Sequence, residues 1–494
     1  MSTTSSTITS SSSSTSTSIT TTSSASKSTT SSTSTSTTTS TSKKWSLFIV
    51  ATTTIRTLWK IICGNQTFMS SSDFIAKWSF ENTFLDKTNN FNATPINSPS
   101  FVNSGYVNKA LSLSSISNQY VTTSYIPLVN VSFTIEAWLY PTGFPNTMDH
   151  SILGLCTHPG SNQCLHLTIR KVGSLYKLYM AFFGDSCLGN GSVTANKWTH
   201  VAFVFDQTTL IQSLYLNGVL DNACIATAPL KSSIGNVTIG SIPGIVSAYG
   251  NNSFQGYIDE LTIANQAKSS CEILDDASLA ACFMFDSGFE LIDSGPNDLQ
   301  SQSNASFVSS GHSQQAISFN RSVSSYSQTS SFTGLGTTNK PFTISLWIRP
   351  RNLTGVVVHV SSTVSGGGGW CLPFIGFATN GSLVAQIWSG MAKSVLGPRL
   401  AIASMSHIVE TWSSTNGIRL YINGVLVGSE LVATSTYSAS GVQVYVTLGT
   451  ILNGAGFCVV GLLGSTLPFD GEMDNLRIYS RELTASEVNT LYLM

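Results

Sequence analysis

The sequence contains little charge for its length. Asp, Glu, Lys and Arg make up only 10% of its 494 residues, where about 25% is usual for soluble proteins. Uncharged polar residues and glycine must therefore cover most of the surface. The 23 basic residues do not exceed the 24 acidic ones, and the formal net charge is -1. Without an excess of cations to neutralise phosphates, nucleic acid is not an expected partner.

Several motifs of common enzymes and metal proteins are also absent. None of the nine cysteines belongs to a CxxC pair, which argues against zinc ribbons and thioredoxin-like redox sites. No GxSxG, HExxH or GxxxxGKS motif occurs, so the chemistry of serine hydrolases, zinc proteases and P-loop proteins is not indicated. Scattered cysteines in this number fit disulfides formed in an oxidising compartment.

Residues 1–44 contain almost no apolar side chains and no proline. Residues 2–42 are serine and threonine apart from four positions, too little apolar surface to offset the entropy of ordering the chain. We predict a disordered Ser/Thr-rich tail over 1–44. A glycosylated, mucin-like stalk is the alternative, although such stalks usually carry proline.

An apolar segment follows at 45–63. Its stretch 45–62 is long enough to cross a bilayer, but Arg56 interrupts it. A central arginine costs roughly 3 kcal/mol in the free energy of membrane insertion, and the gain from the eight Leu, Ile, Val and Phe residues of the segment about balances this cost. An uncleaved signal anchor, an interfacial helix and a degenerate leader all stay open. If the segment inserts as a membrane tether, Lys43 and Lys44 place the remaining chain outside the cell.

Beyond residue 73 the sequence repeats itself. Five segments return in the same order at offsets of about 206 to 215, a unit far longer than a solenoid repeat. The pairs are 101–113 with 307–319, 133–141 with 342–350, 212–220 with 418–426, 237–242 with 446–451, and 254–263 with 469–478. We predict two tandem domains at 73–268 and 282–494, with a short helix and linker at 269–281.

Within each copy, apolar residues alternate with a period of two. In FTIEAWLYP (133–141), Phe, Ile, Ala and Leu at the odd positions share one side of a strand. Asn-Gly dipeptides at 217–218 and 423–424 lie between apolar runs and predict two-residue hairpins. Many short strands without crossover helices predict an all-β fold of two antiparallel jelly-roll sandwiches.

Helical signals are confined to the end of each copy. Ser269 is followed at the third position by Glu272, and Thr484 is followed in the same way by Glu487. This spacing is typical of a capping box at a helix N-terminus. We therefore predict that a single short helix closes each domain.

The motifs in their order resemble a known family. They are the opening aromatic strands (78–86 and 282–293), FTIEAWLYP and FTISLWIRP, KWTHVAFVFD (197–206), LYLNG and LYING, and GYIDELTI with GEMDNLRI. Over 73–494 they resemble the laminin G-like (LamG-like) members of the concanavalin A-like lectin and glucanase superfamily. The resemblance implies a jelly-roll fold. It is less specific for function, because this fold hosts adhesion modules, glycan binders and glycosidases.

The resemblance also implies calcium as a cofactor. Members of the superfamily often hold the ion at the sandwich edge, with one aspartate from the last-strand motif and one from the opening segment. The matching positions are Asp259 with Asp86 and Asp474 with Asp293, and neighbouring oxygens could complete the shell. The alternative, which we favour, is that these side chains cap turns.

Glucanases of the superfamily carry an E-x-D-x-E pattern on one strand, since glycoside hydrolysis needs two carboxylates beside the scissile bond. Glu472 and Asp474 begin such a pattern, but residue 476 is leucine. In the first copy the three matching positions are 257, 259 and 261, and only Asp259 is acidic. We therefore expect no glycosidase activity.

Cysteines and histidines alternate at 156–166. Cys156, His158, Cys164 and His166 could bind zinc, but an external location favours a disulfide between Cys156 and Cys164. The other predicted disulfides are Cys187 with Cys224, Cys371 with Cys458, and Cys271 with Cys282 across the domain boundary, which leaves Cys63 odd.

Two tryptophans are candidates for stacking on a sugar ring. Trp370 and Trp388 lie in the least repetitive part of the second copy, although a core position is the alternative for both. Sequons for N-glycosylation lie after the apolar segment and agree with an external location. They are at Asn65, Asn92, Asn130, Asn190, Asn236, Asn251, Asn304, Asn320, Asn352 and Asn380.

These observations together predict an extracellular or cell-surface protein. We expect a non-enzymatic recognition or adhesion module that binds glycans or glycoproteins through loops at the rim of the sandwiches. A secreted or tethered glycan-processing enzyme and a structural coat protein are the alternatives.

Overall fold

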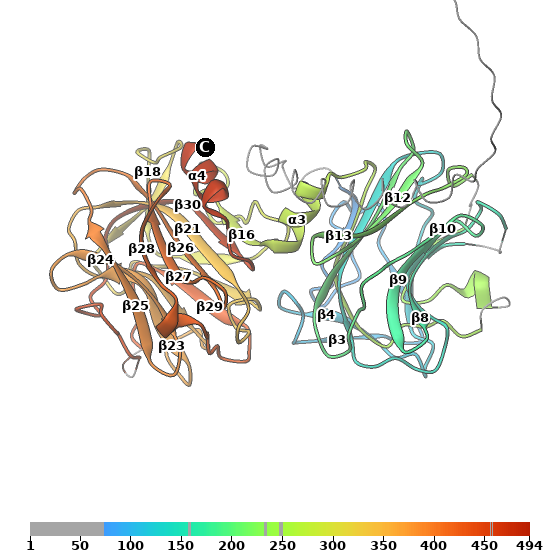
Figure 1. Ribbon diagram of the computed structural model, residues 1–494, viewed down its shortest axis with the longest axis horizontal. Coiled ribbons are helices and arrows are strands. Elements are labelled where there is room, and N and C mark those ends of the chain that lie inside the picture. The colour runs from blue at the N-terminus through green and yellow to red at the C-terminus, as the bar shows by residue number, and fades with distance from the viewer. Residues whose placement is uncertain (1–73, 157–159, 232–234, 247–249, 455, 457) are drawn as a thin grey trace, which may run out of the picture. The chain divides into compact units, whose positions relative to one another are not determined.

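The computed structural model describes residues 74–494, except 157–159, 232–234, 247–249, 455 and 457. The predictions for 1–63, including the tail, the membrane tether and Cys63, fall outside these residues. Within the described residues the strands form four antiparallel sheets, two from each copy of the repeat (Figure 1). The all-β prediction is confirmed. No helix in this part of the chain has the length and apolarity needed to traverse a lipid bilayer.

The first sandwich consists of an eight-stranded sheet A and a seven-stranded sheet B. Sheet A has the order β13-β12-β11-β6-β15-β4-β3, with β1 paired to β15, and sheet B has the order β10-β9-β8-β7-β14-β5-β2. Sheet A contains β1 (Phe74–Trp78), β3 (Ser100–Val102), β4 (Ala110–Leu113), β6 (Phe133–Pro141), β11 (Thr199–Asp206), β12 (Ile211–Leu216), β13 (Val219–Ile225) and β15 (Gly256–Ala264). Sheet B contains β2 (Thr94–Ile96), β5 (Tyr120–Thr123), β7 (Asp149–Leu155), β8 (Leu165–Val172), β9 (Leu175–Ala181), β10 (Ser186–Leu188) and β14 (Val237–Ile239).

The second sandwich repeats this topology strand for strand. Sheet C has the order β18-β19-β30-β21-β26-β27-β28, with β16 paired to β30, and sheet D has the order β17-β20-β29-β22-β23-β24-β25. Sheet C contains β16 (Leu279–Phe283), β18 (Ser306–Val308), β19 (Ala316–Asn320), β21 (Phe342–Pro350), β26 (Ser406–Ser413), β27 (Gly417–Ile422), β28 (Val425–Glu430) and β30 (Asp470–Tyr479). Sheet D contains β17 (Ser301–Ser303), β20 (Ser327–Phe332), β22 (Val356–Ser361), β23 (Cys371–Phe377), β24 (Ser382–Trp388), β25 (Ala392–Arg399) and β29 (Val444–Leu448).

The core of each sandwich is built from the alternation seen in the sequence. On β6 the side chains of Phe133, Ile135, Ala137 and Leu139 are buried in the core of the first sandwich. The matching residues of β21 are buried in the core of the second sandwich. They are Phe342, Ile344, Leu346 and Ile348. Because alternate side chains of a strand point to opposite faces, the intervening residues belong to the outer faces of sheets A and C.

The hairpins use the Asn-Gly turns that the sequence predicts. Asn217 and Gly218 join β12 to β13 with φ of 50° and 77°, and Asn423 and Gly424 join β27 to β28 with φ of 50° and 76°. Two consecutive positive φ angles define a type I′ turn, whose twist matches that of the flanking strands. The turn chemistry therefore fixes the register of both hairpins.

Each copy ends in the predicted capped helix. Helix α3 (Ser270–Ser278) begins after Ser269, and α4 (Ala485–Leu493) begins after Thr484, each with a reciprocal capping box to Glu272 or Glu487. Ile273 of α3 packs on the outer face of sheet A, and α4 packs on the outer face of sheet C through its two buried apolar residues. Short 3-10 helices lie at η2 (Pro243–Ile245) and η3 (Val432–Thr434).

Three of the four predicted disulfides are confirmed, and each stays within one sandwich. They are Cys156–Cys164, Cys187–Cys224 and Cys371–Cys458.

The fourth predicted disulfide, between Cys271 and Cys282, is wrong. Cys282 on β16 is a free, buried thiol, and Cys271 in the first turn of α3 is bonded elsewhere. A disulfide needs Cα atoms within about 6.8 Å. The seven residues of α3 after Cys271 already rise about 10 Å before β16 begins.

Candidate functional site

The two opening-segment aspartates, Asp86 and Asp293, are buried residues that hold turns together. Asp86 accepts a hydrogen bond from the backbone N–H of Lys77 at 2.7 Å, and Asp293 accepts one from the N–H of Cys282 at 2.8 Å. Each also accepts two further backbone N–H groups from its own turn. Burial raises the pKa of Asp293 to about 6.

The two last-strand aspartates also make the same kind of contact in both copies of the repeat. Asp259 accepts hydrogen bonds from the N–H groups of Val107 and Glu260 at 3.0 and 2.9 Å. Asp474 does the same for Ser313 and Asn475, at 3.0 and 2.8 Å. Among the residues that the structure describes, no three His, Cys, Asp or Glu side chains gather where they could hold a metal ion. Calcium at these positions stays a prediction, and the geometry supports the turn-capping interpretation.

The incomplete glucanase pattern is engaged in contacts within the chain. Glu472 lies on β30 directly opposite Arg349 of β21. The carboxylate of Glu472 forms an ion pair of 2.6 Å with Arg349 and a longer one of 3.5 Å with Arg351. Asp474, two residues further along the strand, caps the turn described above.

The Cys/His array at 156–166 contains a disulfide in place of a zinc site. Cys156 and Cys164 are covalently joined, so their thiolates cannot serve as metal ligands, and the zinc alternative is wrong. His158 lies outside the described residues. His166 is buried on β8, and this burial lowers the pKa of its imidazole to about 4.

Trp370 and Trp388 are partly buried against the core of the second sandwich. The indole Nε1 of Trp370 donates a hydrogen bond of 2.9 Å to the carbonyl of Ser438. Its ring also meets the edges of Phe374 and Tyr437. The geometry therefore favours the core alternative, and a role of either tryptophan in ligand binding stays a prediction.

A different cluster of polar side chains occupies the outer face of sheet B. Strands β7, β8 and β9 are neighbours there, and Asp149, Arg170 and Lys177 lie opposite one another across the three strands. The next row along the strands consists of Ser151, Thr168 and Tyr179. We call these six residues the sheet B face.

The ion pair at the centre of the sheet B face is rigidly arranged. Asp149 has a fully buried carboxylate, and it accepts two hydrogen bonds of 2.7 Å from Nε and Nη2 of Arg170. The guanidinium carbon of Arg170 also lies 3.5 Å from the ring centroid of Tyr179. Bidentate pairing and stacking fix the orientation of an arginine. Arg170 and Tyr179 are nevertheless only partly buried and can contact a ligand.

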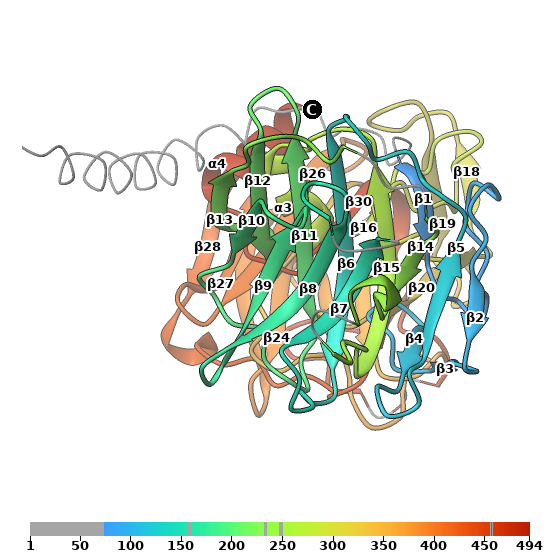
Figure 2. The same ribbon diagram turned by 90° about the vertical axis from the view of Figure 1, so that its right-hand side faces the viewer.

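In the first sandwich the described part of the segment between β14 and β15 packs at one end of sheet B. Ile242 and Ile245 pack there near the Cys156–Cys164 disulfide, and Asn252 accepts a hydrogen bond of 3.0 Å from the hydroxyl of Ser151. Figure 2 shows this yellow-green segment beside β14, while β8 and β9 lie on the other side of β7. Arg170, Lys177 and Tyr179, on β8 and β9, are partly exposed.

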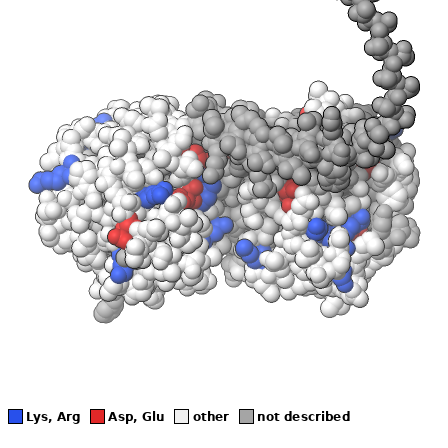
Figure 3. Space-filling view, viewed as in Figure 1, with Lys and Arg blue, Asp and Glu red and all other residues white. Residues whose placement is uncertain are grey.

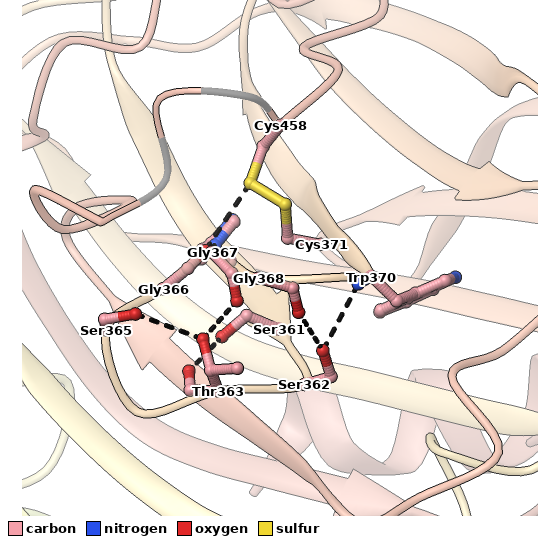
Figure 4. Close-up of a disulfide and its surroundings, with 11 residues drawn as sticks. Ser361, Ser362, Thr363, Ser365, Gly366, Gly367, Gly368, Trp370, Cys371 and Cys458 are labelled. Atoms are coloured by element: carbon pink, nitrogen blue, oxygen red, sulfur yellow. Dashed lines mark hydrogen bonds between the residues drawn. A yellow bond between two sulfur atoms is a disulfide. The ribbon is translucent and has the colours of Figure 1, made fainter.

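In the second sandwich the corresponding face is closed. Val384 of β24 packs against Ile451 and Leu463 from the longer segment between β29 and β30. Gln386, two residues further along β24, donates a hydrogen bond of 3.0 Å to the carbonyl of Val460. The Cys371–Cys458 disulfide fastens the same segment to β23, next to the glycine-rich hairpin tip before Trp370 (Figure 4).

Sequence reasoning missed the sheet B face. One signal was available, because the hairpin 165–181 contains Arg170, Lys171 and Lys177 and no acidic residue, whereas the matching hairpin 371–388 has no charged residue at all. The partner of Arg170 was not readable in the same way. Asp149 is 21 residues away from Arg170 in the sequence. The two residues lie opposite each other because the pairing of β7 with β8 shifts by one residue between Ser151 and Leu153.

The fold and the sequence together define a tandem lectin-like jelly roll. The family described as the concanavalin A-like lectin/glucanases superfamily matches residues 115–274 and 321–489, more than half of the chain. The protein belongs to this family, in its laminin G branch, as the sequence motifs predicted.

Solved structures with a similar fold have low identity to this chain. Domain 4 of an extracellular GH43 arabinanase from Geobacillus stearothermophilus, in complex with arabinotriose, is 19% identical, with 41% of this chain and 97% of that chain covered and a TM-score of 0.35. A CBM40 of the Ruminococcus gnavus IT-sialidase, bound to α2,3 sialyllactose, is 19% identical, with coverage of 30% and 82% and a TM-score of 0.25. Domains LG4-5 of the mouse laminin α1 chain are 12% identical, with coverage of 72% and 85% and a TM-score of 0.22. No curated protein matches the sequence.

Proposed function

We propose that this protein is an extracellular, non-enzymatic carbohydrate-binding module whose first sandwich binds a glycan on the sheet B face. The observation that supports the proposal most is the rigid Asp149–Arg170–Tyr179 arrangement on an accessible part of that face. Sugars are bound in proteins by fixed hydrogen-bonding groups beside an aromatic side chain, and groups fixed before binding lose little entropy when the ligand arrives. This proposal differs from the sequence-based expectation, which placed binding at the rim loops.

The lectin-like family supports a carbohydrate as the ligand, and the three disulfides support a location in an oxidising, extracellular compartment. The closed face of the second sandwich supports a single site of this kind for the pair. The second copy would then act as a structural neighbour or bind through other surfaces.

A glycan array with the full-length protein, run with and without calcium, tests the proposal. The variant is Tyr179→Ala, and its matched control is Tyr125→Ala. Tyr125 is 37% exposed and follows β5, which three strands (β14, β7 and β8) separate from β9 in sheet B. We expect the wild type and the control to retain the same glycans and Tyr179→Ala to lose affinity by about tenfold, the effect of one good contact.

Two results would contradict the proposal. Unchanged glycan binding by Tyr179→Ala would move the site away from the sheet B face. Release of free sugar from a bound oligosaccharide on prolonged incubation would show that the protein is an enzyme.

A further inference from the structure

The β8–β9 hairpin concentrates positive charge in a protein that has little charge. Arg170, Lys171 and Lys177 lie within 17 residues, Leu165–Ala181, that contain no Asp or Glu, while the whole chain has a net charge of -1. Figure 3 shows blue side chains gathered over the surface that β8 and β9 occupy in Figure 1. A local excess of one sign on such a surface attracts ligands of the opposite sign.

Arg170 and Lys177, the two basic residues of the hairpin on the sheet B face, differ in whether a carboxylate neutralises them. Arg170 is compensated by Asp149, which is buried beneath it. Lys177 is the direct cross-strand neighbour of Arg170, and no salt bridge involves Lys177 among the residues that the structure describes. Like charges placed opposite each other on neighbouring strands are destabilising. An anion bound from outside would relieve this repulsion.

The fold itself does not require these charges. The equivalent hairpin of the second sandwich, Cys371–Trp388, contains no charged side chain. Both hairpins nevertheless form the same pair of strands in the same sheet order. The basic row therefore belongs to the accessible face of the first copy and is absent from the closed face of the second.

We infer that the sheet B face is selective for acidic glycans, with a carboxylate or sulfate group of the sugar bound at Nζ of Lys177. Arg170 adds positive potential beside this group, and Tyr179 contacts the sugar to which the group is attached. The inference rests on the proposed function for the choice of a glycan as ligand. It adds a charge requirement that a neutral oligosaccharide cannot meet.

The test measures binding of the full-length protein to three immobilised polysaccharides at low and at high salt. Heparin supplies sulfate groups, polygalacturonate supplies carboxylates, and dextran is neutral. The variants are Lys177→Glu and the conservative Lys177→Arg. The matched control is Lys393→Glu, because Lys393 is also a partly buried strand lysine but lies on β25 of the second sandwich.

We expect binding to heparin or polygalacturonate that weakens as salt rises, since counterions screen the attraction. Lys177→Glu should reduce this affinity by tenfold or more, the effect of losing one charge-assisted contact. Lys177→Arg and Lys393→Glu should bind nearly as the wild type does. Retention by heparin alone or by polygalacturonate alone would identify the acidic group.

The results that overturn the inference are distinct from those that overturn the proposed function. Equal loss of affinity in Lys177→Glu and Lys393→Glu would mean that only net charge matters. Salt-independent binding to dextran, lost in Tyr179→Ala, would preserve the glycan site and refute its preference for acids. Binding to phosphatidylserine vesicles but to no polysaccharide would refute both.

Discussion

Glu410 occupies in the second sandwich the core position that Phe203 occupies in the first. Phe203 on β11 lies opposite Ile135 of β6, and Glu410 on β26 lies opposite Ile344 of β21, which is the repeat counterpart of Ile135. Glu410 is completely buried, and neither of its carboxyl oxygens has a hydrogen-bond partner among the residues that the structure describes. Burial raises the pKa of this carboxyl well above its ordinary value. The second sandwich therefore contains a destabilising acid in a core that the first fills with an aromatic ring.

Glu410→Leu should stabilise the second sandwich. Removal of a buried polar group that lacks a partner is worth about 1–3 kcal/mol in the free energy of unfolding, or about 2–4 °C of Tm per kcal/mol for a domain of this size. Calorimetry of the full-length protein measures the change. The matched control is Phe203→Leu, because Phe203 is already apolar. This variant should have a lower Tm, since the smaller side chain leaves a void. An unchanged or lower Tm for Glu410→Leu would show that the carboxyl is stabilised by a contact in solution.

The same residue predicts how stability depends on pH. The unfolded chain ionises Glu410 above a pKa of about 4.3, whereas the folded chain keeps it protonated, so the folded state binds the extra proton. Stability should therefore decrease as pH rises from about 4 towards neutrality, by up to about 1.4 kcal/mol per pH unit for this group. Glu410→Gln should remove this part of the slope. Urea midpoints of both proteins between pH 4 and 8 measure it, and parallel curves would contradict the assignment.

Asp149 and Arg170 should be strongly coupled. Arg170→Met leaves a buried carboxylate without its cation, which costs about 3–5 kcal/mol in a buried pair. In Asp149→Leu the remaining Arg170 is partly exposed and can be solvated, so the loss should be smaller. The double variant should lose less than the sum of the two single changes. Urea unfolding of all four proteins completes this cycle, and additive effects would mean that the pair does not stabilise the sheet B face.

The outer face and the core differ in how far the sequence could predict them. Alternation along 133–141 and the Asn-Gly turns are local signals, so the strands, hairpins and sandwiches could be predicted from them. The Asp149–Arg170 pair depends on a bulged register between strands, which no local pattern specifies. Glu410 interrupts the apolar alternation at a core position, so the local pattern does not predict that it is buried. The wrong prediction of a Cys271–Cys282 disulfide has a similar cause, because the number of residues between two cysteines does not give their distance when a helix lies between them.

Calcium should bind weakly or not at all at the four aspartates. Asp474 and Asp259 already accept backbone hydrogen bonds, which a cation would have to displace. Millimolar calcium should therefore leave the Tm unchanged, because only a ligand that saturates the native state stabilises it. Asp474→Ala should lower the Tm in the presence and in the absence of calcium alike. A shift of several degrees with calcium, abolished by Asp474→Ala, would establish a calcium site.

Cys282 should be an unreactive thiol in the native protein. Its side chain is buried on β16, and burial raises the pKa of the thiol, which lowers the fraction of the nucleophilic thiolate. Iodoacetamide should leave the peptide that contains Cys282 unmodified until the protein is denatured and should then label it completely without any reductant. Cys282→Ser should keep the disulfides Cys156–Cys164, Cys187–Cys224 and Cys371–Cys458 in a non-reducing peptide map. A Cys271–Cys282 peptide pair in that map of the wild type, or rapid labelling of Cys282 in the native protein, would contradict this assignment.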